Sequence, residues 1–312
     1  MSFPKVTIVG AGQVGATAAF TLLTHGIADV TLIDVAEGLP QGKALDIMHA
    51  RSIMRFGPTV AGTNDYAETA GSDVVVITAG IPRKPGMTRD ELLSINAGIV
   101  SSVIKSAVAA SPQAVFICVT NPLDVMTDLA WKLSGLPASR VFGMGGVLDS
   151  ARFAYFIAQA TGAAIGDVEA LVVGAHGDAM VPLPRLSTVA GRPLTDLLPA
   201  EEIAEVVRRT VFGGAEVVAL LKTGSAFYAP GVSVAAMVEA VVGEEGAILP
   251  SCVQLNGEYG IDGVHMSVPA LLGLTGVVAI PELPLDDAEL SALRASAAQV
   301  REQITALEAT RC

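Results

Sequence analysis

The chain has few cysteines, few aromatic residues and few positive charges. Its three cysteines, Cys118, Cys252 and Cys312, lie far apart and form no C-x-x-C pair, which excludes a disulfide framework and favours reduced thiols. Nineteen Lys and Arg residues face 31 Asp and Glu residues, and the net charge of −12 disfavours binding to nucleic acid or to an anionic membrane. A small anionic ligand would need a local cluster of cationic side chains.

Long apolar runs are also missing, although 51% of the residues are hydrophobic. The longest weakly polar stretch, Val268–Ile280, contains two glycines and is shorter than the roughly 20 residues of a membrane span. The first residues, Met1–Lys5, lead directly into an expected strand without the apolar segment of an export signal. We therefore expect a globular, cytoplasmic protein with no membrane partner, and we expect no metal site.

The first half of the sequence alternates short β-branched runs with helical patterns. This alternation predicts an α/β fold with a doubly wound parallel sheet. The expected strands are Val6–Gly10, Val30–Ile33, Val74–Ile77, Val115–Val119 and Arg140–Gly143.

The second half has a different pattern and predicts an α+β domain. The expected helices are Ser150–Thr161, Ala200–Leu221, Val232–Val242 and Asp286–Glu308, with a strand at Val168–Val173 and further short strands before the last helix. We expect one domain over residues 1–145 and a second over 146–312. No Ser/Gly-rich linker separates them, so the junction near residues 142–147 should be packed.

A glycine-rich turn at residues 10–15 (GAGQVG) follows the first expected strand and opens a helical pattern. In a Rossmann-type dinucleotide site, Gly10 permits the tight turn, Gly12 lets the backbone approach the pyrophosphate, and Gly15 lets the helix pack on the strand. The helix N-terminus then offers free N–H groups to phosphates. On its own this motif is equally compatible with an ordinary glycine-rich turn.

Asp34 ends the second expected strand, 19 residues past Gly15 (34 − 15). A carboxylate at about this distance accepts a hydrogen bond from a ribose 2′-hydroxyl and repels a 2′-phosphate, which favours NAD over NADP. An S-adenosylmethionine-binding fold also combines a glycine turn with an acid on the second strand. A sheet edge that merely ends in an acidic residue is the third interpretation.

Of the four histidines, His176 is the candidate for proton transfer. It follows a strand pattern within the segment GAHGD, where small neighbours leave the imidazole open to a ligand. His25 at a helix end, His49 in a helical stretch and His265 among strand residues are interpreted as structural.

Asp149 and Arg152 are three residues apart at the start of an expected helix, so they share one helix face. Asp149 is either a helix N-cap or a carboxylate that fixes the tautomer of His176. Arg152 is either paired with Asp149 at the surface or free to hold a substrate carboxylate through two parallel hydrogen bonds.

A Pro/Gly-punctuated loop at residues 81–89 (IPRKPGMTR) carries two more arginines, Arg83 and Arg89. Two such residues would be unremarkable on a solvated surface. The loop, however, follows the strand Val74–Ile77, and open α/β sheets bind ligands beyond the carboxyl ends of their strands. A lid that carries cations over a bound anion is therefore a second interpretation.

Taken together, the motifs GAGQVG, DIMHA, TAGIPRKPGMTR, VTNPLDV, GVLDSAR and GAHGD resemble the lactate/malate dehydrogenase family nearly end to end. Within that family the chain is similar to the malate dehydrogenases that resemble lactate dehydrogenases. The resemblance implies that His176 takes the hydroxyl proton while C2 gives a hydride to NAD, and that Asp149 orients His176. It also gives the catalytic interpretation of Asp149 precedence over the cap.

The resemblance implies further contacts with substrate and cofactor. Substrate would be held by Arg152 at the C1 carboxylate, by Arg89 at the C2 oxygen, and by Asn121. The implied cofactor-binding residues are Gly10, Ala11, Gly12, Gln13, Val14, Gly15, Asp34, Asn96, Val119, Thr120 and Asn121.

Arg83 decides the expected substrate. Its position is typically glutamine in the family's lactate enzymes and arginine in its malate enzymes, and a second cation can pair the second carboxylate of a four-carbon dicarboxylate. Ser225 would border the same pocket. We expect malate and oxaloacetate as substrates and a homodimer or homotetramer. The alternatives are a lactate or other 2-hydroxy acid dehydrogenase, a non-catalytic NAD-binding protein and, from another enzyme class, a methyltransferase.

Overall fold

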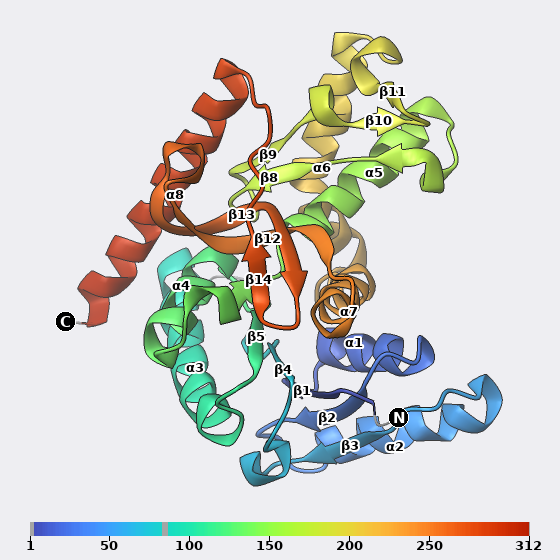
Figure 1. The fold of residues 1–312 in the computed structure, drawn as a ribbon, viewed down its shortest axis with the longest axis vertical. Coiled ribbons are helices and arrows are strands. Elements are labelled where there is room, and N and C mark those ends of the chain that lie inside the picture. Colours follow the sequence, from blue (N-terminus) through green and yellow to red (C-terminus); the bar gives the residue numbers. More distant parts are fainter. Residues whose placement is uncertain (1–2, 83–86, 312) are drawn as a thin grey trace.

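The computed structural model describes residues 3–82 and 87–311. A mixed sheet runs through the whole molecule, and helices cover both of its faces (Figure 1). The parallel part of this sheet comes from the first half of the chain, and the antiparallel part comes from the second half.

The first half is a Rossmann-type unit, as predicted. Its strands run in the order β3-β2-β1-β4-β5-β6 and pair in parallel. The elements are β1 (Lys5–Val9), α1 (Gln13–Thr24), β2 (Asp29–Ile33), α2 (Leu39–Met54), β3 (Val60–Thr63), η1 (Tyr66–Thr69), β4 (Val74–Ile77), α3 (Arg89–Ala110), β5 (Val115–Cys118), α4 (Leu123–Ser134), η2 (Ala138–Arg140) and β6 (Val141–Gly143).

Burial explains why these strands are near-continuous apolar runs. β4 (VVVI) and β5 (VFIC) are buried along their entire length because helices cover both faces of the sheet. Val6 lies opposite Val30 on one side and opposite Val74 on the other, so the strands end in register. The loops that follow β1, β2, β4 and β5 therefore meet at one edge of the sheet, beyond the carboxyl ends of the strands.

The second half extends the sheet and adds a small separate one. Its elements are α5 (Gly146–Thr161), η3 (Ile165–Asp167), β7 (Val168–Glu169), β8 (Val172–Gly174), β9 (Met180–Pro182), η4 (Pro184–Leu186), β10 (Thr188–Val189), β11 (Arg192–Pro193), η5 (Leu194–Asp196), α6 (Ala200–Leu221), α7 (Tyr228–Val242), β12 (Ala247–Asn256), η6 (Glu258–Gly260), β13 (Asp262–Gly273), β14 (Gly276–Ala279) and α8 (Asp287–Arg311). The large sheet continues from β6 through β12, β13, β8 and β9.

Two strand predictions in this half were wrong. The expected strand Val168–Val173 is two strands in different sheets: β7 pairs with β10, whereas β8 pairs with β9 and β13. The chain changes sheet at Leu171, whose backbone N–H donates to Ser187 Oγ and whose carbonyl accepts from Leu183. Of the later strands, β12 and β13 are not short, with ten and twelve residues, whereas β14 has four.

Two helices begin earlier in the sequence than expected. α5 begins at Gly146 and not at Ser150, and α7 begins at Tyr228 and not at Val232.

In β12 and β13, Pro250 lies directly opposite Pro269, and these prolines interrupt the residue pattern from which a long strand is recognised.

Helix α7 from the second half packs on α1 from the first (Figure 1). The contact is close because Gly231 has no side chain, and a Cβ at this position would lie 2.6 Å from Thr17 Cβ. This packing places the start of α1 beside the second half of the chain. The domain boundary after residue 145 stays a prediction.

Helix α3 is long and apolar enough, by length and composition, to cross a membrane. In the structure it packs against α4 and β4 and buries Val100, Ile104 and Ala107. These contacts are those of a helix that covers a sheet in the core of a globular protein. We interpret α3 as such a core helix.

Candidate active site

The glycine turn between β1 and α1 has the shape of a dinucleotide cradle. Gly10 has φ +106°, and a Cβ there would lie 2.6 Å from Thr78 Oγ1. A Cβ at Gly15 would clash with the carbonyl oxygen of Gly10, so only glycine lets α1 pack this closely on β1. At Gly12, by contrast, a Cβ would meet nothing within 4 Å, which leaves space over the backbone for a ligand.

The start of α1 is free to bind an anion. Gly12 is the N-cap residue, and no side chain caps the helix. The unpaired N–H groups and the positive end of the helix dipole suit a phosphate. The residues of this turn therefore fit the pyrophosphate of a dinucleotide.

Asp34 braces the same turn from the end of β2. Its Oδ2 accepts the backbone N–H of Ala11 at 2.8 Å, and its Oδ1 accepts the N–H of Ala36 at 3.0 Å. A carboxylate has about four acceptor sites, so each oxygen retains one for a ribose hydroxyl.

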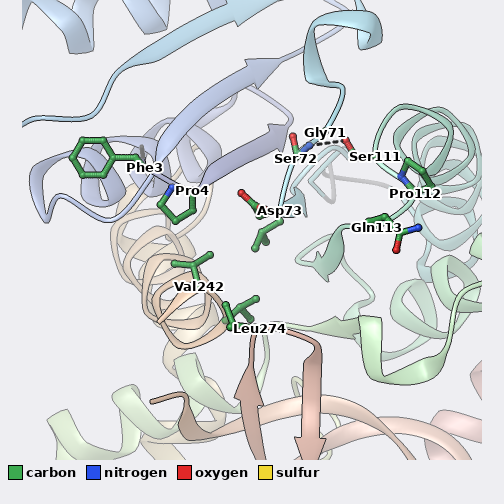
Figure 2. A pocket seen from close by; sticks show the side chains of 12 residues that line it. Phe3, Pro4, Gly71, Ser72, Asp73, Ser111, Pro112, Gln113, Val242 and Leu274 are labelled. Atoms are coloured by element: carbon green, nitrogen blue, oxygen red, sulfur yellow. Dashed lines mark hydrogen bonds between the residues drawn. The ribbon is translucent and has the colours of Figure 1, made fainter. Parts of the chain in front are cut away.

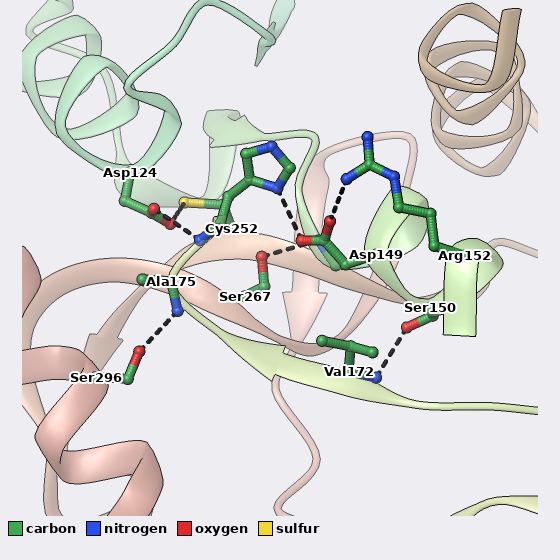
Figure 3. Close-up of polar contacts among 11 residues, drawn as sticks. Asp124, Asp149, Ser150, Arg152, Val172, Ala175, Cys252, Ser267 and Ser296 are labelled. Carbon is green, nitrogen blue, oxygen red and sulfur yellow. Dashed lines mark hydrogen bonds and ion pairs between the residues drawn. The ribbon is translucent and has the colours of Figure 1, made fainter. Parts of the chain in front are cut away.

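His176, Asp149 and Arg152 meet at the start of α5. His176 Nδ1 lies 2.7 Å from Asp149 Oδ2, and Arg152 Nη1 lies 3.1 Å from Asp149 Oδ1 (Figure 3). The side chain of Asp149 is only 2% exposed, whereas those of His176 and Arg152 are 16% and 18% exposed. Asp149 is thus a buried carboxylate that holds two largely buried side chains.

The structure also answers whether Asp149 caps its helix. Gly145 is the N-cap residue of α5, and Asp149 lies inside the first turn with its backbone N–H bonded to the carbonyl of Gly145. Its side chain contacts His176 and Arg152 and makes no cap hydrogen bond. The N-cap interpretation of Asp149 was therefore wrong.

A second buried carboxylate, Asp124 near the start of α4, was missed by sequence reasoning. Its Oδ2 accepts the backbone N–H of His176 at 2.9 Å, and its Oδ1 lies 3.3 Å from Cys252 Sγ (Figure 3). Burial raises the pKa of Asp124 to about 6, against the opposing effects of His176 and Cys252. Its position within the NPLD segment was the only available signal, and an acid in a first helical turn is ordinary.

The charges around His176 determine its protonation. Burial lowers its pKa, but the charge and hydrogen bond of Asp149 and the charge of Asp124 outweigh burial and the opposing charge of Arg152. The net result is a raised pKa. An imidazole held in this way can take up and release a proton near neutral pH.

His176 and Arg152 border a cavity of about 310 Å³ between the two halves of the chain. Its wall includes Val14, Val119, Asn121, Arg152, His176 and Ser225. Residues from the glycine-turn helix, from the loop after β5 and from the second half therefore share one cavity.

Asn96 and Thr120 lie beneath this site and are buried. The Oδ1 of Asn96 accepts the N–H of Ile81, and its Nδ2 donates to the carbonyls of Ile81 and Asn121 at 3.2 and 2.7 Å. Thr120 Oγ1 donates to the carbonyl of Ala79 at 2.7 Å. Both side chains thus tie together the loops that follow β4 and β5.

Arg83 lies outside the described residues. Arg89 is the first residue of α3, and only its backbone is described. The start of α3 is fixed by a capping box, in which Thr88 Oγ1 accepts the N–H of Glu91 and Glu91 accepts the N–H of Thr88. The roles expected for the two arginines stay predictions.

The other histidines lie away from this cavity. His25, the C-cap residue of α1, and His49 on α2 are both exposed. His265 is fully buried in β13, with Nδ1 at 3.3 Å from Asp128 Oδ1 and with Nε2 lacking a hydrogen-bond partner. Within residues 3–82 and 87–311, no group of three or more His, Cys, Asp or Glu side chains is placed to hold a metal ion.

A second cavity, of about 450 Å³, lies at the opposite end of the parallel strands (Figure 2). Phe3 and Asp73 on its wall come from segments that precede β1 and β4, and Leu274 comes from the turn after β13. None of the predicted site residues that the structure describes borders it. The smaller cavity is the one that brings His176, Arg152 and Asn121 together.

Known proteins are similar to this chain over nearly its full length. Residues 4–143 match the family model described as lactate/malate dehydrogenase, NAD binding domain, and residues 146–311 match lactate/malate dehydrogenase, alpha/beta C-terminal domain. The chain is 51% identical over 304 residues to the malate dehydrogenase of Dehalococcoides mccartyi. This match covers 97% of this chain and 99% of that protein.

Solved structures agree with these sequence matches. The malate dehydrogenase from Salinibacter ruber superimposes with a TM-score of 0.94 at 45% identity, over 98% of each chain. The lactate dehydrogenase from Cryptosporidium parvum, complexed with lactic acid and nicotinamide adenine dinucleotide, gives 0.95 at 43% identity over 99% of each chain. The chain therefore belongs to the lactate/malate dehydrogenase family and carries that family's NAD-binding domain.

Proposed function

We propose that the chain acts as an NAD-dependent malate dehydrogenase, with His176 as its proton-transfer residue. The reaction follows from full-length likeness to malate dehydrogenases such as that of Dehalococcoides mccartyi. The observation that carries the site is the contact of His176 and Arg152 with one buried carboxylate, Asp149, at the wall of the cavity. NAD, when bound, accepts the hydride from C2 of malate.

The hydrogen bond at Nδ1 assigns the two ring nitrogens of His176. An ionised carboxylate only accepts hydrogen bonds, so Nδ1 carries the proton that is donated to Asp149. The Nε2 lone pair is then free to take the hydroxyl proton of malate. Asp149 stabilises the resulting imidazolium through the same hydrogen bond, and the proton returns to the C2 oxygen when oxaloacetate is reduced.

Arg152 provides positive charge in a strongly acidic protein. One of its nitrogens contacts Asp149, and a guanidinium has further N–H donors that can grip the C1 carboxylate of the substrate. Asn121 borders the same cavity and would hydrogen-bond to the substrate. Arg89 would reach the C2 oxygen from the start of α3.

Arg83 is proposed as the residue that selects dicarboxylates, on the sequence alone. The fold does not separate the two substrate classes, because the lactate dehydrogenase from Cryptosporidium parvum matches as closely as the malate dehydrogenases. Pairing of a second carboxylate with Arg83 would favour oxaloacetate, whereas pyruvate would leave the guanidinium unmatched. A lactate dehydrogenase is the second candidate, and both the arginine at this position and the full-length likeness to malate dehydrogenases disfavour it.

We assign the glycine turn and Asp34 to NAD. The free N–H groups at the start of α1 would hold the pyrophosphate, and Asp34 would accept from the adenosine ribose. Val119 borders the cavity and would contact the cofactor directly. Asn96 and Thr120, whose polar atoms bond to loop backbone, would act by holding those loops in place.

We further propose a homodimer or homotetramer that acts in the cytoplasm. Apolar side chains are exposed on α2, as at Ile53 and Met54, and at the end of α6, as at Leu220 and Leu221. Exposed apolar groups of this kind favour subunit contacts. The buried free thiols Cys118 and Cys252 suit a reducing compartment. Light scattering after size-exclusion chromatography would determine the number of subunits.

Replacement of His176 by asparagine tests the assignment. We expect NADH binding, followed by fluorescence titration, to stay within twofold of wild type, while kcat falls at least a hundredfold in both directions. The matched control His25→Asn, at an exposed histidine just after α1, should retain full activity. Full turnover by the His176→Asn variant would overturn the proposal.

A further inference from the structure

Asp124 joins three segments that are far apart in the sequence. Its carboxylate lies in the first turn of α4, accepts from the backbone of His176 52 residues later, and receives the thiol of Cys252 from β12. The side chain is almost fully buried, with 5% exposure. Figure 3 shows Asp124 and Cys252 directed toward each other beside the segment that contains Ala175.

Among the described residues, few donors act on this carboxylate. Oδ2 accepts the N–H of His176, Oδ1 accepts the S–H of Cys252, and the backbone N–H of Asp124 itself adds a third donor. A buried carboxylate with so few donors is costly to ionise, and burial raises the pKa of Asp124 to about 6. Each donor therefore helps decide whether the carboxylate is charged.

The thiol is itself a neutral donor. Burial raises the pKa of Cys252 well above its ordinary value, and the charge of Asp124 raises it further. Burial likewise raises the pKa of Cys118 to about 11, so this neighbouring thiol adds no charge. The charged groups that act on His176 are Asp149 and Arg152 on α5 and Asp124 on α4.

Packing leaves the thiol little freedom. Cys252 pairs with Gly143 of β6, which pairs in turn with Cys118 of β5. A Cβ at Gly143 would lie 3.2 Å from Cys252 Cβ and 2.5 Å from Thr127 Oγ1, so side chains already fill the space beside the thiol.

We propose that Asp124 and Cys252 are positioning residues for the proton-transfer histidine. Asp124 holds the backbone of His176 and adds a second negative charge to that of Asp149, and the Cys252 thiol keeps Asp124 ionised. The inference rests on the proposed role of His176. It predicts that charge at Asp124, and not only its shape, determines the pH at which His176 changes protonation.

The test compares the pH profiles of kcat/KM of the wild type and Asp124→Asn, for reduction of oxaloacetate and for oxidation of malate. Asp124→Asn keeps the shape and an oxygen acceptor for the N–H of His176, but it removes the charge. Reduction of oxaloacetate needs protonated His176, whereas oxidation of malate needs the neutral ring. For both reduction and oxidation, we expect the inflection in the pH profile of kcat/KM to move to lower pH by roughly half a unit or more. Reduction would then fall about threefold on its alkaline limb, while oxidation would rise about threefold on its acidic limb.

Substitutions of Cys252 test whether its thiol keeps Asp124 ionised. Cys252→Ala removes the donor and should move both inflections in the same direction by less, whereas Cys252→Ser retains a donor and should restore the wild-type values. Cys118→Ala is the matched control, because it removes a buried thiol from the same sheet and should leave both inflections unchanged. An inflection that stays in place in Cys252→Ala would overturn the role of the thiol.

A measurement independent of turnover follows the imidazole itself. The chain has four histidines, so ring resonances of selectively labelled protein can be assigned with the His176→Asn variant. The His176 titration should move down in Asp124→Asn. Equal losses of rate at every pH with an unmoved titration would show a merely structural Asp124 and refute the inference. Failure of the proposed function would look different, because His176→Asn would then remain active. If Asp124→Asn does not fold, the Cys252 variants still decide.

Discussion

Replacement of Asp149 by asparagine separates the charge of this carboxylate from its shape. In the structure Asp149 Oδ2 lies 2.7 Å from His176 Nδ1, and Oδ1 lies 3.1 Å from Arg152 Nη1. The amide retains one acceptor but has no charge with which to stabilise the imidazolium. It can also donate to Nδ1, which would leave the proton on Nε2 and prevent that atom from acting as a base.

The size of the effect follows from the lost interaction. A hydrogen bond to a charged group contributes about 1.5–3 kcal/mol, and each 1.4 kcal/mol is a factor of ten in rate. We therefore expect kcat/KM to fall about 10- to 150-fold in both directions. Loss of the negative charge should also lower the pKa of His176, so that reduction of oxaloacetate declines from a lower pH.

Initial rates with oxaloacetate and NADH, and with malate and NAD, provide the assay. NADH binding by fluorescence and the melting temperature serve as controls, since Asp149 does not contact the glycine turn. Rates within twofold of wild type in both directions, in a folded variant, would refute this account of the buried carboxylate.

Three further predictions concern the cofactor cradle and the buried histidine. Gly15→Ala should lower the melting temperature and weaken NADH binding more than tenfold because its Cβ would clash with the Gly10 carbonyl, whereas Gly12→Ala should weaken NADH binding alone. Asp34→Ala should raise the ratio of kcat/KM with NADPH to that with NADH at least tenfold, since the carboxylate that repels a 2′-phosphate is gone; an unchanged ratio would contradict its role. Burial lowers the pKa of His265, so the unfolded chain binds a proton that the folded chain does not, and stability should fall below about pH 6.5. Between pH 8 and pH 5, the melting temperature should fall less steeply with decreasing pH for His265→Gln than for the wild type.

The parts of the site that could be predicted from the sequence were those with local patterns. The glycine turn with Asp34 follows from spacing, and Asp149 shares a helix face with Arg152 because the two residues are three apart. No local pattern brings His176 to Asp149, 27 residues away. The residues alone left this pairing as one of two interpretations of Asp149, and the family resemblance decided between them.

Asp124 was beyond prediction for a related reason. Its partners are a backbone N–H 52 residues away and a thiol 128 residues away, and neither contact leaves a pattern in the sequence. The fold was predicted well where buried strands are continuous apolar runs, as in β4, and poorly where one apolar run serves two sheets, as in β7 and β8. A run of apolar residues indicates burial but does not specify the pairing partner.

A comparison of initial rates with two keto acids tests the central claim most directly. Initial rates of NADH oxidation would be measured with oxaloacetate and with pyruvate, for the wild type and for Arg83→Gln. The account predicts that wild-type kcat/KM for oxaloacetate exceeds that for pyruvate by about 10⁴, and that Arg83→Gln narrows this ratio at least a hundredfold. Equal rates with the two keto acids in the wild type would contradict it.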